Sequence, residues 1–226
     1  MANARFLTFL LFTACCWAQT STGPASITAV GEASASASPD LARIDIGVVT
    51  QAAIAQDATV ANASQTGAVI TALQGLLGSN ANIKTISYSV SPVYNNPPAG
   101  QTASIVAYTV TNVIEVTISD LTQTGKVIDT AIQSGANRIQ GISFDIQDRN
   151  PLMAQAVKAA AGRARSIADA IAAGLNVHTG AVLHAHESVN SPIPYVGIAA
   201  AGPTTPIQTG QITVQASVTV EFAIAP

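Results

Sequence analysis

Residues 65–70 read Gln-Thr-Gly-Ala-Val-Ile, and residues 123–128 read Gln-Thr-Gly-Lys-Val-Ile. The two hexapeptides agree at five of six positions. Each opens or lies within a segment whose apolar residues recur at helical spacing, and each segment is preceded by strand-like alternation and followed by more of it. The sequence therefore predicts a duplicated β-α-β unit.

The segments around the two hexapeptides extend this pattern. Apolar residues step by three and four over 56–77 and 121–133, and Gly78 and Gly135 follow these runs, which predicts two helices. The turn signal Ser38-Pro39-Asp40 interrupts the first alternating segment, which is either one bent strand or a strand pair. The alternating segments that predict strands are 27–50, 83–94, 104–119 and 138–147.

A third, longer helix is predicted after residue 149. Asn150 is a candidate N-cap, Pro151 suits the first turn and Gly174 is a candidate terminator. The residues expected to form its buried seam are Met153, Val157, Ala160, Ala164, Ile167 and Ile171. Strands are then predicted at 182–189 and 211–224, and a loop of about twenty residues rich in Pro, Gly and Ala separates them.

These elements together predict an α+β fold with a mixed, mostly antiparallel sheet and helices packed on one face. We expect residues 1–18 to be a signal peptide, 19–26 a flexible lead-in and 27–226 a single domain.

The start of the chain indicates export. Arg5 precedes the apolar run 6–12, and a cut after Ala18 gives a secretory signal peptide, so we expect a periplasmic or secreted protein. A membrane anchor would need about 20 apolar residues, more than this run provides. Lipidation at Cys15 is the other alternative. Both cysteines, Cys15 and Cys16, lie in this leader, so the processed chain would have no thiol chemistry.

The charge content argues against nucleic acid as a partner. Nine Lys and Arg against twelve Asp and Glu give a net charge of −3, and the basic residues are scattered. Only 9% of the residues are charged, which is low for a soluble monomer. Low charge favours a protein that buries surface by self-association, although a surface of small residues would also explain it.

The ordered set of segments resembles the SIMPL-domain family of exported bacterial proteins. The stretches that carry the resemblance are 30–33 with 39–42, Tyr108 and Asn112 before Asp120-Leu121, 125–129 with 135–144, the Ala-rich helix 154–175 and the last strand 212–222. The resemblance implies a mixed α+β fold, a periplasmic or outer-membrane-associated location, ring-like homo-oligomers and no established enzymatic activity. The chain departs from the family pattern at Gly174-Leu175-Asn176 and in the loop after Asn190.

His184 and His186 are the candidate metal ligands. On a strand these two imidazoles point to one face and Glu187 to the other. A zinc or copper site needs at least a third ligand, for which His178 is the one obvious candidate. The alternative is two ordinary solvated histidines on a sheet.

The long loop carries the candidate interaction surface, an apolar run whose members are Pro192, Ile193, Pro194, Tyr195, Val196 and Ile198. Such a run either contacts a partner or folds back on its own domain. We find neither a Gly-x-Ser-x-Gly elbow nor a phosphate-binding glycine motif, and no paired carboxylates at a predictable spacing.

We therefore expect an exported protein that is not an enzyme and acts through self-assembly or partner binding, in envelope or oxidative stress. No cofactor and no small-molecule ligand can be identified from the sequence. The alternatives are a metal-binding module that uses His184 and His186, and a hydrolase with an unrecognised site.

Overall fold

The computed structural model describes residues 24–225 apart from 79–80, 99–100, 196–206 and 208. The predicted signal peptide, Cys15 and most of the predicted lead-in lie outside the described residues. The elements are β1 (Ser26–Ala37), β2 (Leu41–Ala52), α1 (Ala55–Leu77), β3 (Asn82–Tyr94), β4 (Ile105–Ile118), η1 (Leu121–Gln123), α2 (Thr124–Gln133), β5 (Arg138–Asp145), α3 (Asn150–Gly174), β6 (His178–Tyr195) and β7 (Gln211–Ala225).

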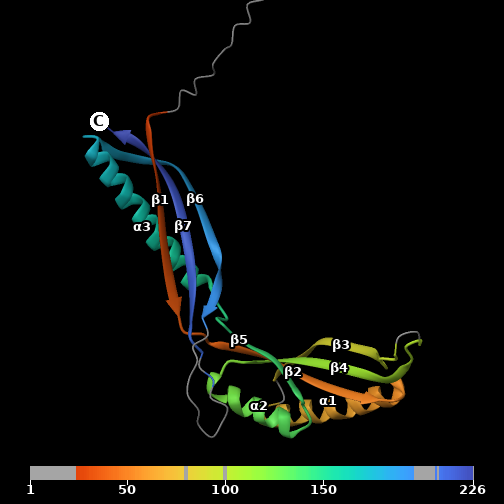
Figure 1. The fold of residues 1–226 in the computed structure, drawn as a ribbon. Coiled ribbons are helices and arrows are strands. Elements are labelled where there is room, and N and C mark those ends of the chain that lie inside the picture. Colours follow the sequence, from red (N-terminus) through yellow and green to blue (C-terminus); the bar gives the residue numbers. More distant parts are fainter. Residues whose placement is uncertain (1–23, 79–80, 99–100, 196–206, 208, 226) are drawn as a thin grey trace, which may run out of the picture.

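The predicted α+β class is confirmed, and the strands divide between two antiparallel sheets where we expected one. One sheet has the order β3-β4-β2-β5 and the other β1-β7-β6. The predicted turn at residues 38–40 separates β1 from β2, which belong to different sheets. The chain thus enters one sheet, crosses to the other, and returns after β5 through α3 (Figure 1).

The predicted duplication builds the four-stranded sheet. The units β2-α1-β3 and β4-α2-β5 interleave, so each unit's two strands flank a strand of the other, as in a split β-α-β fold. Thr66 and Val69 of the first hexapeptide are buried, and so are Thr124 and Val127 at the matching positions of the second. The repeated sequence therefore encodes the same buried helix face twice.

α1 and α2 cover one face of this sheet and form its core. β2 contributes the fully buried Ile44, Ile46 and Val48. Asn62 of α1 is also fully buried, and its amide donates to the backbone oxygens of Val48 (2.9 Å) and Val110 (3.3 Å). These hydrogen bonds satisfy a polar side chain that would otherwise destabilise the core. Gly78 and Gly135, which end the helical runs as predicted, have positive φ angles of 93° and 117°.

α3 packs on one face of the three-stranded sheet through a row of small residues. Leu152, Ala156, Ala160, Ala164, Ala168 and Ala172 are buried. A Cβ on Gly31 of β1 would lie 2.1 Å from the Ala160 backbone oxygen and 2.3 Å from the Ala164 nitrogen. The backbones of β1 and α3 are therefore in direct contact, which the small residues on both elements permit.

This arrangement shows that the predicted seam of α3 was wrong at its last two positions, while Met153 and Val157 are partly buried against the core. Ala160 and Ala164 are buried as expected, whereas Ile167 and Ile171 are 44% and 39% exposed. The seam is shifted because close packing of a helix on a strand selects the alanines and turns the larger side chains outward.

The ends of α3 also differ from the prediction. Asn150 is the first helical residue, and the Asp148 carboxylate accepts a hydrogen bond from the Asn150 N–H at 3.0 Å. Asp148 therefore satisfies a free N–H group at the start of the helix. Gly174 is the last helical residue, and Asn176 adopts the left-handed conformation that follows, with φ of 56°.

The strand β6 continues into the predicted loop. We expected a strand to Val189, but the strand reaches Tyr195, where it pairs with Gln211. Pro192 and Pro194 are tolerated because β6 is an edge strand and its pairing with β7 shifts register between Asn190 and Ile193.

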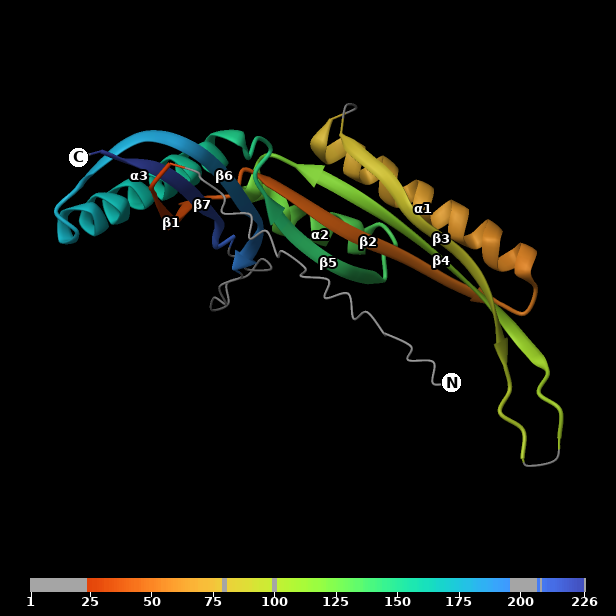
Figure 2. The same ribbon diagram turned by 90° about the horizontal axis from the view of Figure 1, so that it is seen from above.

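The molecule is L-shaped, with one sheet-and-helix unit in each arm (Figure 1). α3 lies on the outer side of one arm and α1 and α2 on the outer side of the other, so the helix-free faces of both sheets line the inner angle (Figure 1). Viewed from above, the β3–β4 hairpin extends beyond the end of α1 (Figure 2). Each arm has its own apolar core.

Candidate functional site

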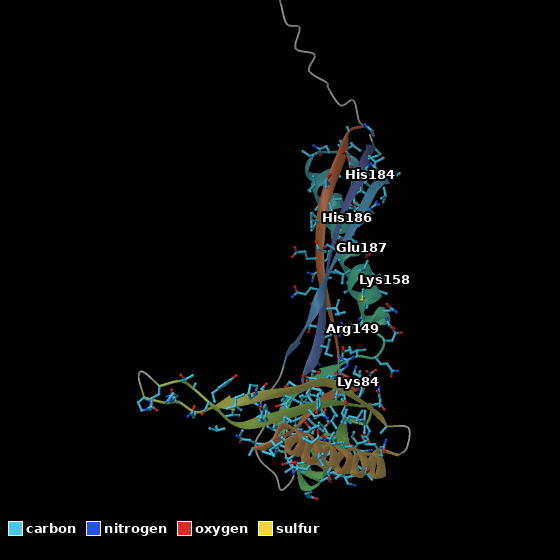
Figure 3. All side chains as sticks on the ribbon, turned by 90° about the vertical axis from the view of Figure 1, so that its right-hand side faces the viewer. Lys84, Arg149, Lys158, His184, His186 and Glu187 are labelled. Atoms are coloured by element: carbon cyan, nitrogen blue, oxygen red, sulfur yellow. The ribbon has the colours of Figure 1, made fainter. Side chains whose placement is uncertain are left out.

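The two histidines lie on the helix-free face of the three-stranded sheet. His184 pairs with Glu221 of β7 and His186 with Thr219, so both share a face, as predicted, and Glu187 belongs to the other face. Figure 3 shows His184 and His186 following one another along β6. Within the described part of the chain, no group of three or more His, Cys, Asp or Glu side chains is placed to hold a metal ion. The proposed metal site therefore stays a prediction based on two ligands.

The predicted interaction surface is only partly described. The backbone of Pro192, Ile193, Pro194 and Tyr195 belongs to β6, whereas Val196 and Ile198 lie outside the described residues. Past this segment, Ile207 packs against the core of the four-stranded sheet. Ile207, which lies between β6 and β7 in the chain, therefore contacts the other arm of the molecule.

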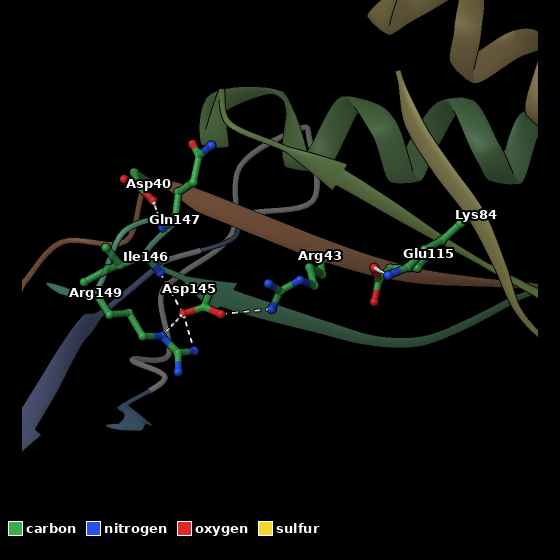
Figure 4. Close-up of polar contacts among 8 residues, drawn as sticks. All are labelled: Asp40, Arg43, Lys84, Glu115, Asp145, Ile146, Gln147 and Arg149. Atoms are coloured by element: carbon green, nitrogen blue, oxygen red, sulfur yellow. Dashed lines mark hydrogen bonds and ion pairs between the residues drawn. The ribbon is translucent and has the colours of Figure 1, made fainter. Parts of the chain in front are cut away.

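The two arms meet at a polar junction centred on Asp145, the last residue of β5. One carboxylate oxygen accepts hydrogen bonds from Arg149 Nε (2.9 Å), Arg149 Nη2 (2.6 Å) and the Ile146 N–H (2.8 Å). The other accepts one from Arg43 Nη1 of β2 at 2.9 Å. Asp40 closes the junction by accepting from the Gln147 N–H at 2.7 Å (Figure 4). This junction ties the two segments that connect the arms, 38–40 and 146–149.

The charge on Asp145 is stabilised by this network. Burial raises the pKa of its carboxyl, but the hydrogen bonds from Arg149, Ile146 and Arg43 outweigh burial and leave the pKa below its ordinary value. The sequence alone does not single out Asp145, because Arg43 lies 102 residues away and no spacing rule connects the two residues.

A second charged group lies on the helix-free face of the four-stranded sheet. Lys84 of β3 pairs with Glu115 of β4 at 2.9 Å (Figure 4). Asp45 of β2 is the cross-strand neighbour of Glu115. Burial and the nearby Glu115 raise the pKa of Asp45, and Lys84 partly opposes them. Two carboxylates side by side with one lysine are held together by the register of three strands.

Surface hollows are shallow and lie apart from these groups. One cavity, of about 570 Å³, lies at the end of α3 and is lined by Arg165, Asp169, His178 and Thr179 among others. Arg165 and Thr179 both donate hydrogen bonds to Asp169, and Arg165 also lies over the Phe222 ring at 5.1 Å. Arg165, Asp169 and Thr179 are thus paired with one another.

Large apolar side chains are exposed on two well-formed parts of the molecule. The first, which we call the hairpin patch, comprises Ile86, Tyr88, Val90, Tyr94, Ile105 and Val106 on β3 and β4, exposed by 43–57%. The second, which we call the α3 flank, comprises Ile167, Ile171 and Leu175, exposed by 39–62%. Side chains at i, i+4 and i+8 form a continuous stripe along a helix. The sequence analysis placed both isoleucines in the core, so this stripe was missed.

No described helix is long and apolar enough to cross a membrane.

The fold and sequence pattern define the protein's class. The chain belongs to the SIMPL family, described as "Protein of unknown function (DUF541)", whose model matches residues 27–222. The predicted resemblance is therefore confirmed.

Two curated relatives are each named "26 kDa periplasmic immunogenic protein". They come from Brucella melitensis biotype 1 and Brucella abortus strain S19. Each is 29% identical to this chain over 224 residues, which cover 91% of this chain and 87% of the relative.

Proposed function

We propose that this chain is an exported, periplasmic envelope protein without enzymatic activity, and that it acts by binding copies of itself or other proteins through its exposed apolar surfaces. The names of the two relatives support the location, as does the leader predicted from residues 1–18. The observation that carries the proposal is the exposure of large apolar side chains on regular elements. Burying such side chains against a partner is favourable by about 25 cal/mol per Å².

The hairpin patch and the α3 flank differ from isolated surface leucines or valines. Six members of the hairpin patch lie on two paired strands, and the three members of the α3 flank lie on one helix stripe. Because both surfaces are held by paired backbone, their burial requires little ordering of the chain. Exposed apolar surface on regular elements marks contact sites more often than it occurs by chance.

Binding is tested by light scattering coupled to size-exclusion chromatography on the exported chain. We expect a mass above that of a single chain in the micromolar range. Replacing Tyr88 and Val106 by serine tests the contribution of the hairpin patch, because both side chains are about half exposed and their loss leaves the core intact. A single-chain mass, together with no partner retained from an envelope extract, would refute the proposal.

The physiological part of the proposal is a role in envelope or oxidative stress. A strain of the source organism that lacks the gene is expected to lose viability in peroxide or detergent, and the wild-type gene should restore it. An assembly-defective variant present at normal abundance should fail to restore it. Full restoration of viability by such a variant would show that the stress role does not depend on assembly.

A further inference from the structure

β1 is a sheet edge without the features that normally block strand addition. Edge strands are usually protected by prolines, lysines or bulges. β6 carries Pro192, Pro194 and three register shifts, β3 carries Lys84, Pro92 and two register shifts, and β5 has a register shift and is eight residues long. In contrast, β1 pairs with β7 over twelve consecutive residues without a shift, and its sequence contains neither proline nor lysine nor arginine.

The register shows which backbone groups of β1 face outward. The Ile224 N–H donates to the Ala25 oxygen at 2.9 Å. The odd-numbered residues of β1 therefore direct their backbone N–H and C=O groups toward β7. The even-numbered residues from Ser26 to Ser36 therefore direct their N–H and C=O groups to the open edge. Arg163 confirms this direction, because its guanidinium reaches from α3 to donate to the Glu32 oxygen at 2.9 Å.

The α3 flank lies on the same side as this edge. Arg163, which contacts β1, is followed at intervals of four by Ile167 and Ile171. Arg165 and Asp169, on the opposite side of the helix, contact Thr179 of β6. A strand added beside β1 would therefore find hydrogen-bonding groups along its backbone and exposed isoleucines above it.

We propose that this edge pairs with β1 of a second copy of the chain, antiparallel and about a two-fold axis perpendicular to the sheet. The inference rests on the proposed self-association and names the surface that makes it. α3 packs on both β1 and β7, and its backbone contacts β1 at Gly31. A two-fold pairing of β1 then brings the α3 helices of the two copies side by side on one face of the sheet. Ile167 and Ile171 of each copy fill the space between them.

This geometry is self-complementary, as a two-fold interface must be. Both copies of α3 would lie on the same face of one continuous six-stranded sheet, ordered β6-β7-β1-β1-β7-β6. Glu32 is the one charged residue of β1, so few like charges oppose one another across the new pairing. An incoming strand would replace the Arg163 contact with backbone hydrogen bonds.

The first test compares two exposed apolar side chains by sedimentation equilibrium. Ile171→Glu is expected to weaken self-association at least tenfold, because it places a carboxylate in the apolar space between helices. Val182→Glu on β6 is the matched control, since Val182 is 54% exposed and lies away from β1. Circular dichroism should show that both variants keep the wild-type secondary structure.

The second test locates the two-fold axis with single cysteines at Thr28, Val30, Glu32 or Ser34, in a background with Cys15→Ser and Cys16→Ser. Mild oxidation should produce a disulfide-linked dimer mainly at one position. Residues two positions from the axis on each strand are about 14 Å apart, beyond the roughly 7 Å limit for a disulfide. Ser188→Cys, on the helix-free face of β6, is the control that should form no disulfide-linked dimer on oxidation.

The results separate this inference from the proposed function. A larger-than-single-chain mass that Ile171→Glu leaves unchanged, with no cross-linking at any β1 position, would overturn the β1 interface and leave self-association standing. A single-chain mass for the wild type at all concentrations would overturn both the second copy at β1 and self-association.

Discussion

Replacing Gly31 by alanine should destabilise the three-stranded arm, because the added methyl group has no room there. The added Cβ would lie 2.1 Å from the Ala160 oxygen, whereas an ordinary contact begins near 3.4 Å. β1 and α3 must then move apart by about 1.3 Å, because both obstacles are backbone atoms that cannot rotate away.

The cost of this movement follows from the packing of the alanine row. Ala160 and Ala164 are completely buried, and a gap of this size removes much of the dispersion contact along the row. Overpacking of this kind costs about 3 kcal/mol. For a chain of this length, that loss lowers the Tm by about 6–12 °C.

The assay is urea unfolding followed by far-ultraviolet circular dichroism, with Gly162→Ala as the matched control. Gly162 is in the same helix, and a Cβ there meets nothing within 4 Å. This control should gain about 0.5–1 kcal/mol, because alanine replaces glycine inside a helix. If Gly31→Ala unfolds at the wild-type urea concentration, β1 and α3 are not in backbone contact and the account of this arm is wrong.

Three further substitutions test the polar groups. Asp145→Asn should lower stability by about 2 kcal/mol at neutral pH through the loss of charge-assisted hydrogen bonds. Because the pKa of Asp145 is lowered in the folded state, its charge stabilises the fold above the ordinary pKa, and this stability is lost as the pH falls through the lower folded pKa. The urea midpoint of the variant should therefore fall less than that of the wild type on acidification. Asp45→Asn should raise the free energy of unfolding at neutral pH by less than about 1 kcal/mol. The pKa of Asp45 is raised in the folded state, so its charge destabilises the fold above that pKa, and this effect disappears on acidification. A fall in the free energy of unfolding of the same size would contradict this. Asn62→Ala should cost about 2–3 kcal/mol in urea unfolding by removing two hydrogen bonds from the core, and a neutral effect would show that water replaces the amide.

The sequence was most informative where structure is local. The bounds of α1, α2 and β3 to β5 were predicted within a few residues. The signals were the paired hexapeptides, the glycines at 78 and 135 and the alternating segments, because each element's own buried face determines its periodicity. The division into two sheets was not predictable in the same way. β1 pairs with β7, which lies almost the whole chain away, and strand periodicity contains no information about which partner a strand will choose.

The errors in α3 and at the junction have specific physical causes. The predicted seam favoured large apolar residues and placed Ile167 in the core. The close contact of α3 with Gly31 instead places alanines against the sheet and leaves Ile167 exposed. Asp145 is recruited by Arg43 from a distant strand, and its importance appears only when β2 and β5 are adjacent. Both features of the candidate site therefore depend on tertiary contacts that spacing in the sequence does not encode.

The most direct test of the account is the mass of the exported wild-type chain in solution, measured by light scattering from low micromolar to hundreds of micromolar. We expect a mass that rises to at least twice that of one chain and falls back upon dilution, with Ile171→Glu shifted to higher concentration. A mass equal to one chain over the entire range would contradict the claim that the exposed apolar side chains of this protein are a binding surface for its own copies.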